Sequence, residues 1–324
     1  MGHLIVPCQP LPGHFEADLG LPDATVAMPA EPVRDLDAQL DRIRGASAVV
    51  TWTSEPVNDR FLDAAGDSLR VVAQCAVGYD NIDVPACRGR GVVVTHTPDM
   101  VTDGTADIAW ALLLGAARRV GEGDRFARSG AWAEHGTLMP AEFIGQPIAG
   151  QTLLIVGAGR IGYATALRSM GWGMRVLYAS RSPKPQFELA PLNAERVEME
   201  DGLRRADFIS VHTPLTPQTR HLLRAEHFAL CKPTAVLVST ARGPVIDERA
   251  LAAALRDGQV FAAGLDVFER EPEVEAALRS LENTLFTPHI GSSDSRCRAR
   301  MVQLCAQNIR AVLTGSEPLT PVPG

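Results

Sequence analysis

One segment constrains the fold of this chain more than any other: the glycine-rich turn GAGRIG at 157–162, which follows the apolar run 152–156 and opens a helix-like stretch. The order of strand, glycine turn and helix is that of a dinucleotide-binding βα unit. Gly157 allows the tight turn, Gly159 lets the backbone approach a pyrophosphate, and Gly162 lets helix and strand pack closely. The free N–H groups at the helix start would face the phosphates. The cofactor contacts predicted here are Gly157, Gly159, Arg160, Ile161 and Gly162.

The alternative to a dinucleotide site is a tight βα turn that binds no ligand. The residues after the next strand help to decide between the two. This strand, predicted over 174–178, is followed by Ser180, Arg181 and Ser182, with Lys184 close behind. An NAD-preferring site places a carboxylate about 20 residues after the glycines, where it binds the ribose 2′-OH. No carboxylate stands there, and a guanidinium is available to pair with a 2′-phosphate. We therefore expect NADP(H) as the preferred cofactor, with NAD possible; a solvated basic loop is the other interpretation.

Composition limits the class of protein. With 324 residues the chain is long enough for about two domains. The formal net charge of −7 argues against a nucleic-acid partner, because phosphate binding needs a basic face. The six cysteines lie far apart and indicate reduced thiols rather than disulfides or metal ligands. A signal-peptide pattern and long apolar runs are both lacking, so we expect a cytoplasmic protein without a membrane partner.

Short β-branched runs alternate with helical patterns along the chain, which predicts an α/β fold with parallel sheets. The strands are expected at 48–52, 69–73, 91–95, 152–156, 174–178, 207–212, 235–240, 260–267 and 284–289. A single long helix is expected over 102–128 and a loop over 131–150. Asp247 is predicted to cap a helix that ends before Gly258.

Three later strands end in polar or charged residues, where the ligands of open α/β sheets bind. The segments are VSTARG at 238–243, GLDVFEREP at 264–272 and FTPHIGS at 286–292. Together with AVGYDNID at 76–83 and VHTPLT at 211–216, they resemble the D-isomer-specific 2-hydroxyacid dehydrogenases over nearly the whole chain. The motifs TADIA at 105–109 and EGDRF at 122–126 favour the glyoxylate/hydroxypyruvate reductase branch.

The resemblance implies two doubly wound, Rossmann-like parallel-sheet domains with the active site in the cleft between them. It places a flavodoxin-like substrate-binding domain at 1–100 with 292–324 and an NAD(P)-binding Rossmann domain at 101–291. It also implies a homodimer with the connector-helix region at the interface.

Catalysis falls, by the same resemblance, to Arg242, Glu271 and His289. Arg242 would hold the carboxylate of a 2-oxoacid and polarise its carbonyl. His289 would donate the proton that the carbonyl oxygen needs after hydride transfer. Glu271 would favour the imidazolium form and fix the tautomer. Glu269 is interpreted as solvated.

The remaining contacts also come from the resemblance. Val77 and Gly78 would supply backbone N–H groups to the substrate, which Arg242 and His289 also contact, and Thr105 would lie at the nicotinamide end. The other expected cofactor contacts are His212, Thr213, Thr240, Ala241, Asp266, Gly291 and Ser292. A metal site is not expected, since hydride transfer with an arginine electrophile needs none.

The leading hypothesis is NADPH-dependent reduction of glyoxylate and hydroxypyruvate to glycolate and D-glycerate. One alternative is a D-2-hydroxyacid dehydrogenase for a larger 2-ketoacid, phenylpyruvate-like or branched. Another is a non-enzymatic, NAD(P)-sensing protein like the corepressors of the same fold.

Overall fold

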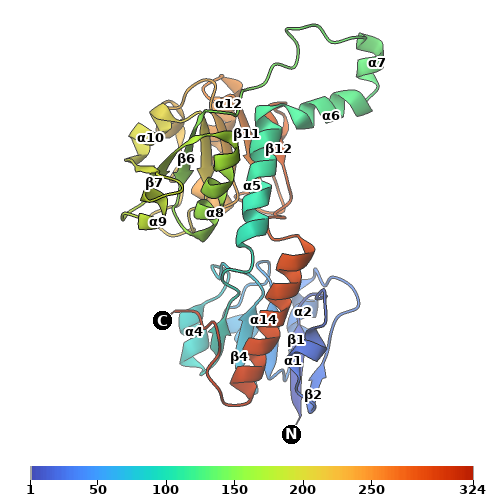
Figure 1. Ribbon diagram of the computed structural model, residues 1–324. Coiled ribbons are helices and arrows are strands. Elements are labelled where there is room, and N and C mark those ends of the chain that lie inside the picture. The colour runs from blue at the N-terminus through green and yellow to red at the C-terminus, as the bar shows by residue number, and fades with distance from the viewer. Residues whose placement is uncertain (1, 324) are drawn as a thin grey trace. The chain divides into compact units, whose positions relative to one another are not determined.

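The computed structural model describes residues 2–323, and the chain divides into two compact units. Unit 1 comprises Met1–Val101 with Ser293–Gly324, and unit 2 comprises Thr102–Ser292. Each unit is built on one parallel sheet with helices around it, which confirms the predicted fold class (Figure 1).

Unit 1 has a five-stranded sheet in the order β2-β1-β3-β4-β5. Its strands are β1 (His3–Pro7), β2 (Ala24–Val26), β3 (Ala48–Thr51), β4 (Val71–Gln74) and β5 (Val93–Thr95). Its helices are α1 (Phe15–Leu19), α2 (Leu36–Arg42), α3 (Asp59–Ala65), α4 (Val84–Gly89) and α14 (Ser295–Leu313). After α14 the chain returns to β5, where Val322 N donates to the Val94 carbonyl at 2.9 Å.

Unit 2 has a seven-stranded sheet in the order β12-β11-β10-β9-β6-β7-β8. Its strands are β6 (Thr152–Val156), β7 (Arg175–Ala179), β8 (Glu195–Arg196), β9 (Phe208–Val211), β10 (Val236–Ser239), β11 (Ala262–Leu265) and β12 (Thr284–Phe286). Its α-helices are α5 (Thr102–Ala117), α6 (Val120–Arg128), α7 (Ala131–His135), α8 (Arg160–Arg168), α9 (Pro185–Glu188), α10 (Met199–Arg205), α11 (Ala225–Phe228), α12 (Glu248–Arg256) and α13 (Ala276–Arg279). Two 3₁₀ turns complete it, η1 (Ser169–Trp172) and η2 (Gly243–Val245).

The central strand β6 is apolar on both faces because helices cover both sides of the sheet. Leu153 and Ile155 join one core cluster with Trp110 of α5, while Leu154 and Val156 join the opposite cluster. The strand order reverses between the neighbouring strands β6 and β9, because β7 and β8 follow on one side of β6 and β9 to β12 on the other. Ligands of doubly wound folds bind at such a point.

One helix prediction and one loop prediction were wrong. The helix expected over 102–128 is divided into α5 and α6, because Arg119 takes the left-handed conformation with φ 54°. The loop expected over 131–150 contains the short helix α7, which Gly130 and Gly136 flank in positive-φ conformations. The cap at Asp247 is confirmed: its side chain accepts from Ala250 N at the start of α12.

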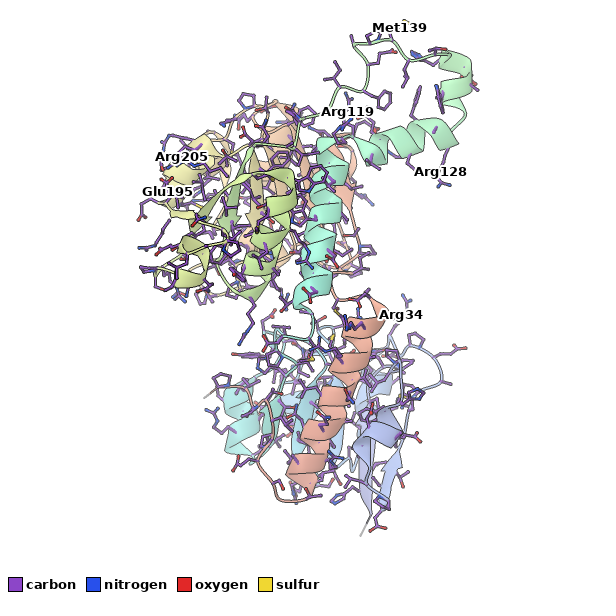
Figure 2. All side chains as sticks on the ribbon, viewed as in Figure 1. Arg34, Arg119, Arg128, Met139, Glu195 and Arg205 are labelled. Carbon is purple, nitrogen blue, oxygen red and sulfur yellow. The ribbon has the colours of Figure 1, made fainter. Side chains whose placement is uncertain are left out.

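Three strands were missed: β1, β2 and β8. The last two are short edge strands, and β8 has no apolar residue that could have signalled it. Ion pairs surround β8, since Glu195 contacts Arg205 at 2.6 Å and Arg175 at 2.6 Å. Figure 2 labels Glu195 and Arg205 at this edge.

Two general features concern the whole described chain. All six cysteines are buried thiols, and burial raises the pKa of Cys87 to about 11 and that of Cys231 to about 12. No helix within residues 2–323 has both the length and the apolar character needed to cross a bilayer.

Candidate active site

His289 lies in the loop after β12, and Asp266 holds this loop in place. Asp266 directly follows β11 and is only 1% exposed. Its carboxylate accepts hydrogen bonds from Thr287 Oγ1 at 2.6 Å and from the amides of Ile290 and Gly291, both at 2.8 Å. Its backbone carbonyl accepts from His289 N at 2.8 Å. Burial raises the pKa of Asp266, and the three donors only partly offset that rise. The loop thus keeps His289 in the left-handed region, with φ 53°.

Glu271 pairs with His289. Its Oε2 lies 2.8 Å from His289 Nδ1, while its Oε1 accepts from Phe268 N at 3.0 Å. Burial raises the pKa of Glu271. The opposing effects of His289, the Phe268 amide and the charge of Arg242 are together larger, so the pKa lies below its ordinary value. Among residues 2–323, nothing accepts from or donates to His289 Nε2. That nitrogen is consequently available to a ligand.

Arg242 follows β10, and the glycine after it determines how closely this loop approaches the glutamate segment. Its Nη1 donates to its neighbour's carbonyl, Ala241 O, at 2.9 Å. A Cβ at Gly243 would overlap the backbone of Phe268 and Glu269. Only glycine fits there, and its absence of a side chain brings the arginine loop against the segment that carries Glu271.

Glu269 is not solvated, and the prediction that it would be was wrong. Its side chain is 19% exposed and its Oε2 lies 3.0 Å from His221 Nε2. Its Oε1 accepts from Glu248 N, the first residue of α12, at 3.0 Å, and Glu269 N donates back to Glu248 Oε1 at 2.7 Å. Sequence reasoning missed this second histidine–glutamate pair because His221 is 48 residues from Glu269 and no motif joins them.

The glycine turn has the shape that a pyrophosphate site requires. At Gly157, φ is 99°, and a Cβ would lie 2.8 Å from the His212 carbonyl group. A Cβ at Gly162 would overlap the Gly157 oxygen. By contrast, Gly159 has nothing within 4 Å of a Cβ position, and no side chain caps α8 behind it. Packing thus demands glycine at Gly157 and Gly162, while the space beside Gly159 is open to a pyrophosphate, so these residues fit a dinucleotide.

The loop after β7 is held by an arginine that the sequence did not single out. Arg196 of β8 donates Nη2 to the carbonyls of Ser180 at 3.0 Å and Arg181 at 3.1 Å, and Ser180 Oγ donates to Ser182 O at 2.6 Å. The side chains of Arg181 and Ser182 stay exposed. Arg196 stands in a two-residue strand that no local pattern predicts, so its contact with this loop could not be anticipated.

The other predicted cofactor residues lie mostly at the same sheet edge. Thr240 and Ala241 follow β10, His212 and Thr213 follow β9, and Thr105 of α5 lies against Gly291, which precedes Ser292. Burial lowers the pKa of His212 to about 3, and its ring bridges Ser210 Oγ (2.8 Å) and Thr240 Oγ1 (3.2 Å). A neutral ring here joins β9 to β10. The predicted substrate residues Val77 and Gly78 lie in unit 1, in the loop after β4.

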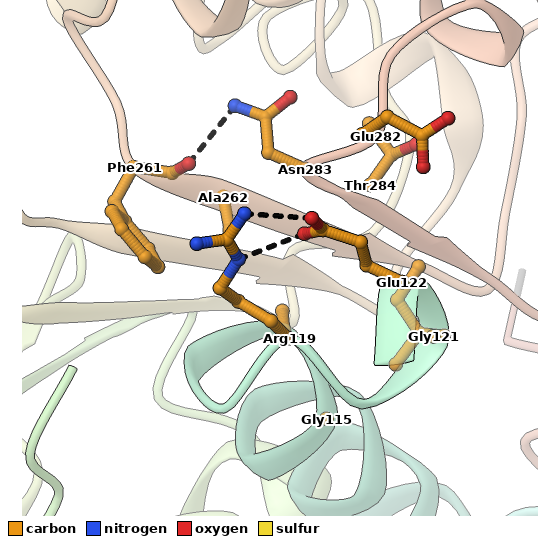
Figure 3. Close-up of a pocket in the computed structure, with 11 residues that line it drawn as sticks. Gly115, Arg119, Gly121, Glu122, Phe261, Ala262, Glu282, Asn283 and Thr284 are labelled. Atoms are coloured by element: carbon orange, nitrogen blue, oxygen red, sulfur yellow. Dashed lines mark hydrogen bonds and ion pairs between the residues drawn. The ribbon is translucent and has the colours of Figure 1, made fainter. Parts of the chain in front are cut away.

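A cavity of about 250 Å³ lies elsewhere in unit 2 (Figure 3). Ala262 and Thr284 line it at the amino ends of β11 and β12, whereas Arg242, Glu271 and His289 follow the carboxyl ends of strands. Arg119 and Glu122 face each other there in a bidentate pair at 2.7 and 2.8 Å. The cavity is therefore not the place where the histidine could act.

The amino-acid sequence is similar to those of known proteins. Residues 110–291 match the family described as D-isomer specific 2-hydroxyacid dehydrogenase, NAD binding domain. The glyoxylate reductase of Thermococcus kodakarensis is 45% identical over 308 residues, which cover 95% of this chain and 90% of that protein.

Solved structures are also similar over the full length. A crystal structure of a Thermus thermophilus protein has a TM-score of 0.90 at 40% identity, covering 99% of this chain and 100% of that one. The NADPH-dependent glyoxylate/hydroxypyruvate reductase of Sinorhizobium meliloti, crystallised with NADP and malonate, has a TM-score of 0.81 at 30% identity. That similarity covers 99% of this chain and 97% of the other.

Proposed function

Because this chain belongs to the D-isomer-specific 2-hydroxyacid dehydrogenase family of NAD(P)-dependent oxidoreductases, we propose that it reduces glyoxylate and hydroxypyruvate with NADPH. The products would be glycolate and D-glycerate. The observation that carries the proposal is the His289–Glu271 pair of 2.8 Å, which occupies Nδ1 and leaves Nε2 without a partner among the described residues. A histidine held in this way can donate a proton from Nε2 to the carbonyl oxygen, which becomes an alkoxide when the hydride is transferred.

The roles of the three residues follow from their chemistry. Arg242 binds the substrate carboxylate with its forked guanidinium and draws electron density from the adjacent carbonyl. His289 donates the Nε2 proton to the carbonyl oxygen, and Glu271 stabilises the imidazolium and keeps the ring oriented. NADPH, when bound, supplies the hydride.

The residues that would hold NADPH are those of the glycine turn and of the loop after β7. The open space at Gly159 and the uncapped start of α8 suit the pyrophosphate. Arg181 and Ser182 are exposed and would receive the 2′-phosphate. Arg196 supports the preference by holding the loop carbonyls of Ser180 and Arg181, so that the loop side chains stay turned outward.

A substrate and cofactor panel tests the proposal. Purified protein is assayed with NADPH and NADH against glyoxylate, hydroxypyruvate and phenylpyruvate. We expect the highest kcat/KM with NADPH and one of the two small 2-oxoacids. Lack of turnover with every 2-oxoacid would reject the activity, and a preference for phenylpyruvate would favour the alternative of a larger 2-ketoacid.

The cofactor preference has its own test. Arg181→Ala should lower kcat/KM with NADPH by about tenfold or more, because a charge-assisted hydrogen bond to the 2′-phosphate is lost. The kcat/KM with NADH should change little. Equal losses with both cofactors would contradict a role in 2′-phosphate binding.

We also propose that the protein is a homodimer whose interface includes the arm formed by α6, α7 and the loop to residue 147. The arm extends from the body of unit 2, and Met139 lies near its far end (Figures 1 and 2). Its large apolar residues are exposed: Val120, Trp132, Leu138, Met139 and Ile144. Such a cluster is typical of a protein–protein interface. Light scattering should give the mass of a dimer. The double variant Trp132→Asp, Met139→Asp should shift that mass toward the monomer. An unchanged mass would exclude the arm as part of the dimer interface.

A further inference from the structure

The loop after β4 in unit 1 has both of its central carbonyls tied to side chains of the same unit. Val77 O accepts from His96 Nδ1 at 2.9 Å, and Gly78 O accepts from Gln74 Nε2 at 3.1 Å. Since a carbonyl can only accept, His96 carries a proton on Nδ1 in this contact. Among residues 2–323, the amides of Val77 and Gly78 donate to nothing.

Gln74 cannot rotate away from this arrangement. It is the last residue of β4 and is fully buried, with 0% exposure. Its Oε1 accepts from Thr51 Oγ1 at 2.7 Å, and its second Nε2 proton goes to Asn81 Oδ1 at 2.8 Å. Every donor and acceptor of the amide is thus used, which fixes which end faces Gly78.

His96 is also held in place by several contacts. Its backbone N and O both bond to Thr320, at 3.1 and 2.7 Å, and Asn308 of α14 in turn binds Thr320. Its ring packs nearly perpendicular to that of Tyr79, with centroids 5.4 Å apart. The C-terminal segment therefore positions the imidazole that binds Val77.

In a trans peptide the N–H points away from the C=O of the preceding residue, so the bond from His96 to the Val77 carbonyl turns the Gly78 amide the other way. The Val77 amide is set in the same manner by the Ala76 carbonyl, which accepts from Thr97 N at 2.9 Å, while Gln74 anchors the following peptide through the Gly78 carbonyl.

We propose that His96 is a positioning residue which, together with this anchored loop, makes the Val77 and Gly78 amides a receptor for the carboxylate of a 2-oxoacid. Two adjacent N–H groups held in this way match the two oxygens of a carboxylate. The inference rests on the proposed function, which supplies the carboxylate. It adds that recognition of the carboxylate depends on a histidine that need not touch the substrate.

Three variants separate the hydrogen bond from packing. His96→Phe keeps an aromatic ring beside Tyr79 but has no donor. His96→Asn loses the ring but places an amide N–H where Nδ1 stood. His96→Ser is too short to reach Val77 and replaces the Phe variant should Phe lower the melting temperature.

The readouts are KM for glyoxylate, Ki for oxamate, KM for NADPH, kcat and Tm. We expect His96→Phe to raise KM for glyoxylate and Ki for oxamate by about tenfold, as for one lost hydrogen bond, with kcat and KM for NADPH nearly unchanged. His96→Asn should restore both constants to within about twofold to threefold of the wild type.

Two outcomes would overturn the proposal. Wild-type constants in a folded His96→Phe variant would show that the N–H is not needed. A variant His96→Asn more impaired than His96→Phe would assign the role to the ring and not to its N–H. Failure of the proposed function is distinguishable from either result, because the wild-type protein itself would then turn over no 2-oxoacid.

Discussion

Two histidine–glutamate pairs lie side by side in unit 2, and they share most of their features. Glu269 pairs with His221 at 3.0 Å, and Glu271, two residues later, pairs with His289 at 2.8 Å. Both histidines adopt positive φ, 49° for His221 and 53° for His289. Both also anchor their backbone amides, on Pro244 O and Asp266 O respectively, each at 2.8 Å.

The pairs differ in which ring nitrogen meets the carboxylate. His221 uses Nε2, the nitrogen farther from the backbone, so its reactive tip is turned into the protein. His289 uses Nδ1 and leaves the tip free. Glu269 is further committed to the first amide of α12 through Glu248. The Glu269 pair thus joins the segments that carry His221, Glu248 and Glu269. The Glu271 pair leaves His289 able to donate a proton from Nε2.

The lesson is that a histidine beside a glutamate becomes a proton donor through its orientation. Both ring nitrogens lie within 3.0 Å of a carboxylate oxygen, but only His289 keeps its Nε2 free of that contact and available to a substrate. The following substitutions test this difference.

His289→Gln should have the largest effect, a fall in kcat of about 10²- to 10⁴-fold, because the proton donor is removed. The matched control is His221→Gln, which should leave kcat within a few-fold of the wild type. Steady-state kinetics with glyoxylate and NADPH measure both. Equal losses in the two variants would contradict the distinction between the pairs.

Glu271→Gln should act through pH. Without the carboxylate the imidazolium of His289 is less favoured, so the midpoint at which the reductive rate declines moves to lower pH. Above that midpoint kcat should fall about 10- to 100-fold, as for a nearby charge. Because the pKa of Glu271 lies below the ordinary carboxyl value, its carboxylate stays ionised as pH falls through that ordinary range, and its contribution to stability is lost only at lower pH. A pH–rate profile with an unmoved midpoint would count against the role of Glu271.

Gly243→Ala tests whether both pairs depend on one support. The added methyl would overlap the backbone of Phe268 and Glu269, in the segment that carries both Glu269 and Glu271. We expect a loss of about 1–3 kcal/mol in unfolding free energy, together with a lower kcat. Denaturant unfolding and kinetics measure the two effects; a variant as stable and active as the wild type would show that the loops pack less closely.

Glu269→Gln should have the smallest effect. The amide can still accept from Glu248 N, so we expect a loss of about 1 kcal/mol in unfolding free energy from the weakened contact with His221. Its pH–rate profile should overlay that of the wild type, and a shift like that of Glu271→Gln would mean that this pair also bears on the reaction.

Much of the fold could be predicted from the sequence, because its signals are local. The glycine turn after β6, the β-branched strands and the Asp247 cap each depend on a few neighbouring residues. The family resemblance, confirmed by the comparisons, carried Arg242, Glu271 and His289 as candidates. Their catalytic roles stay proposals, supported by the pairing of Glu271 with His289.

What escaped prediction depends on contacts between distant segments. Glu269 looks like a solvated glutamate until His221 meets it from 48 residues away. Arg196 has meaning only because β8 lies beside β7 and so reaches the Ser180–Arg181 carbonyls. The break between α5 and α6 at Arg119 also has no local signal, since arginine is an ordinary helix residue.

The charged edge strand β8 of the unit 2 sheet affects whether two molecules can associate through their sheets. β8 is two residues long, and Glu195 there is bound by Arg205 and Arg175, whose hydrogen bonds lower its pKa to about 2. A strand from another molecule would have to break these ion pairs, and it would then find only two residues of β8 with which to form hydrogen bonds. This edge therefore resists strand-to-strand polymerisation even in acid, where an unpaired glutamate would already be neutral.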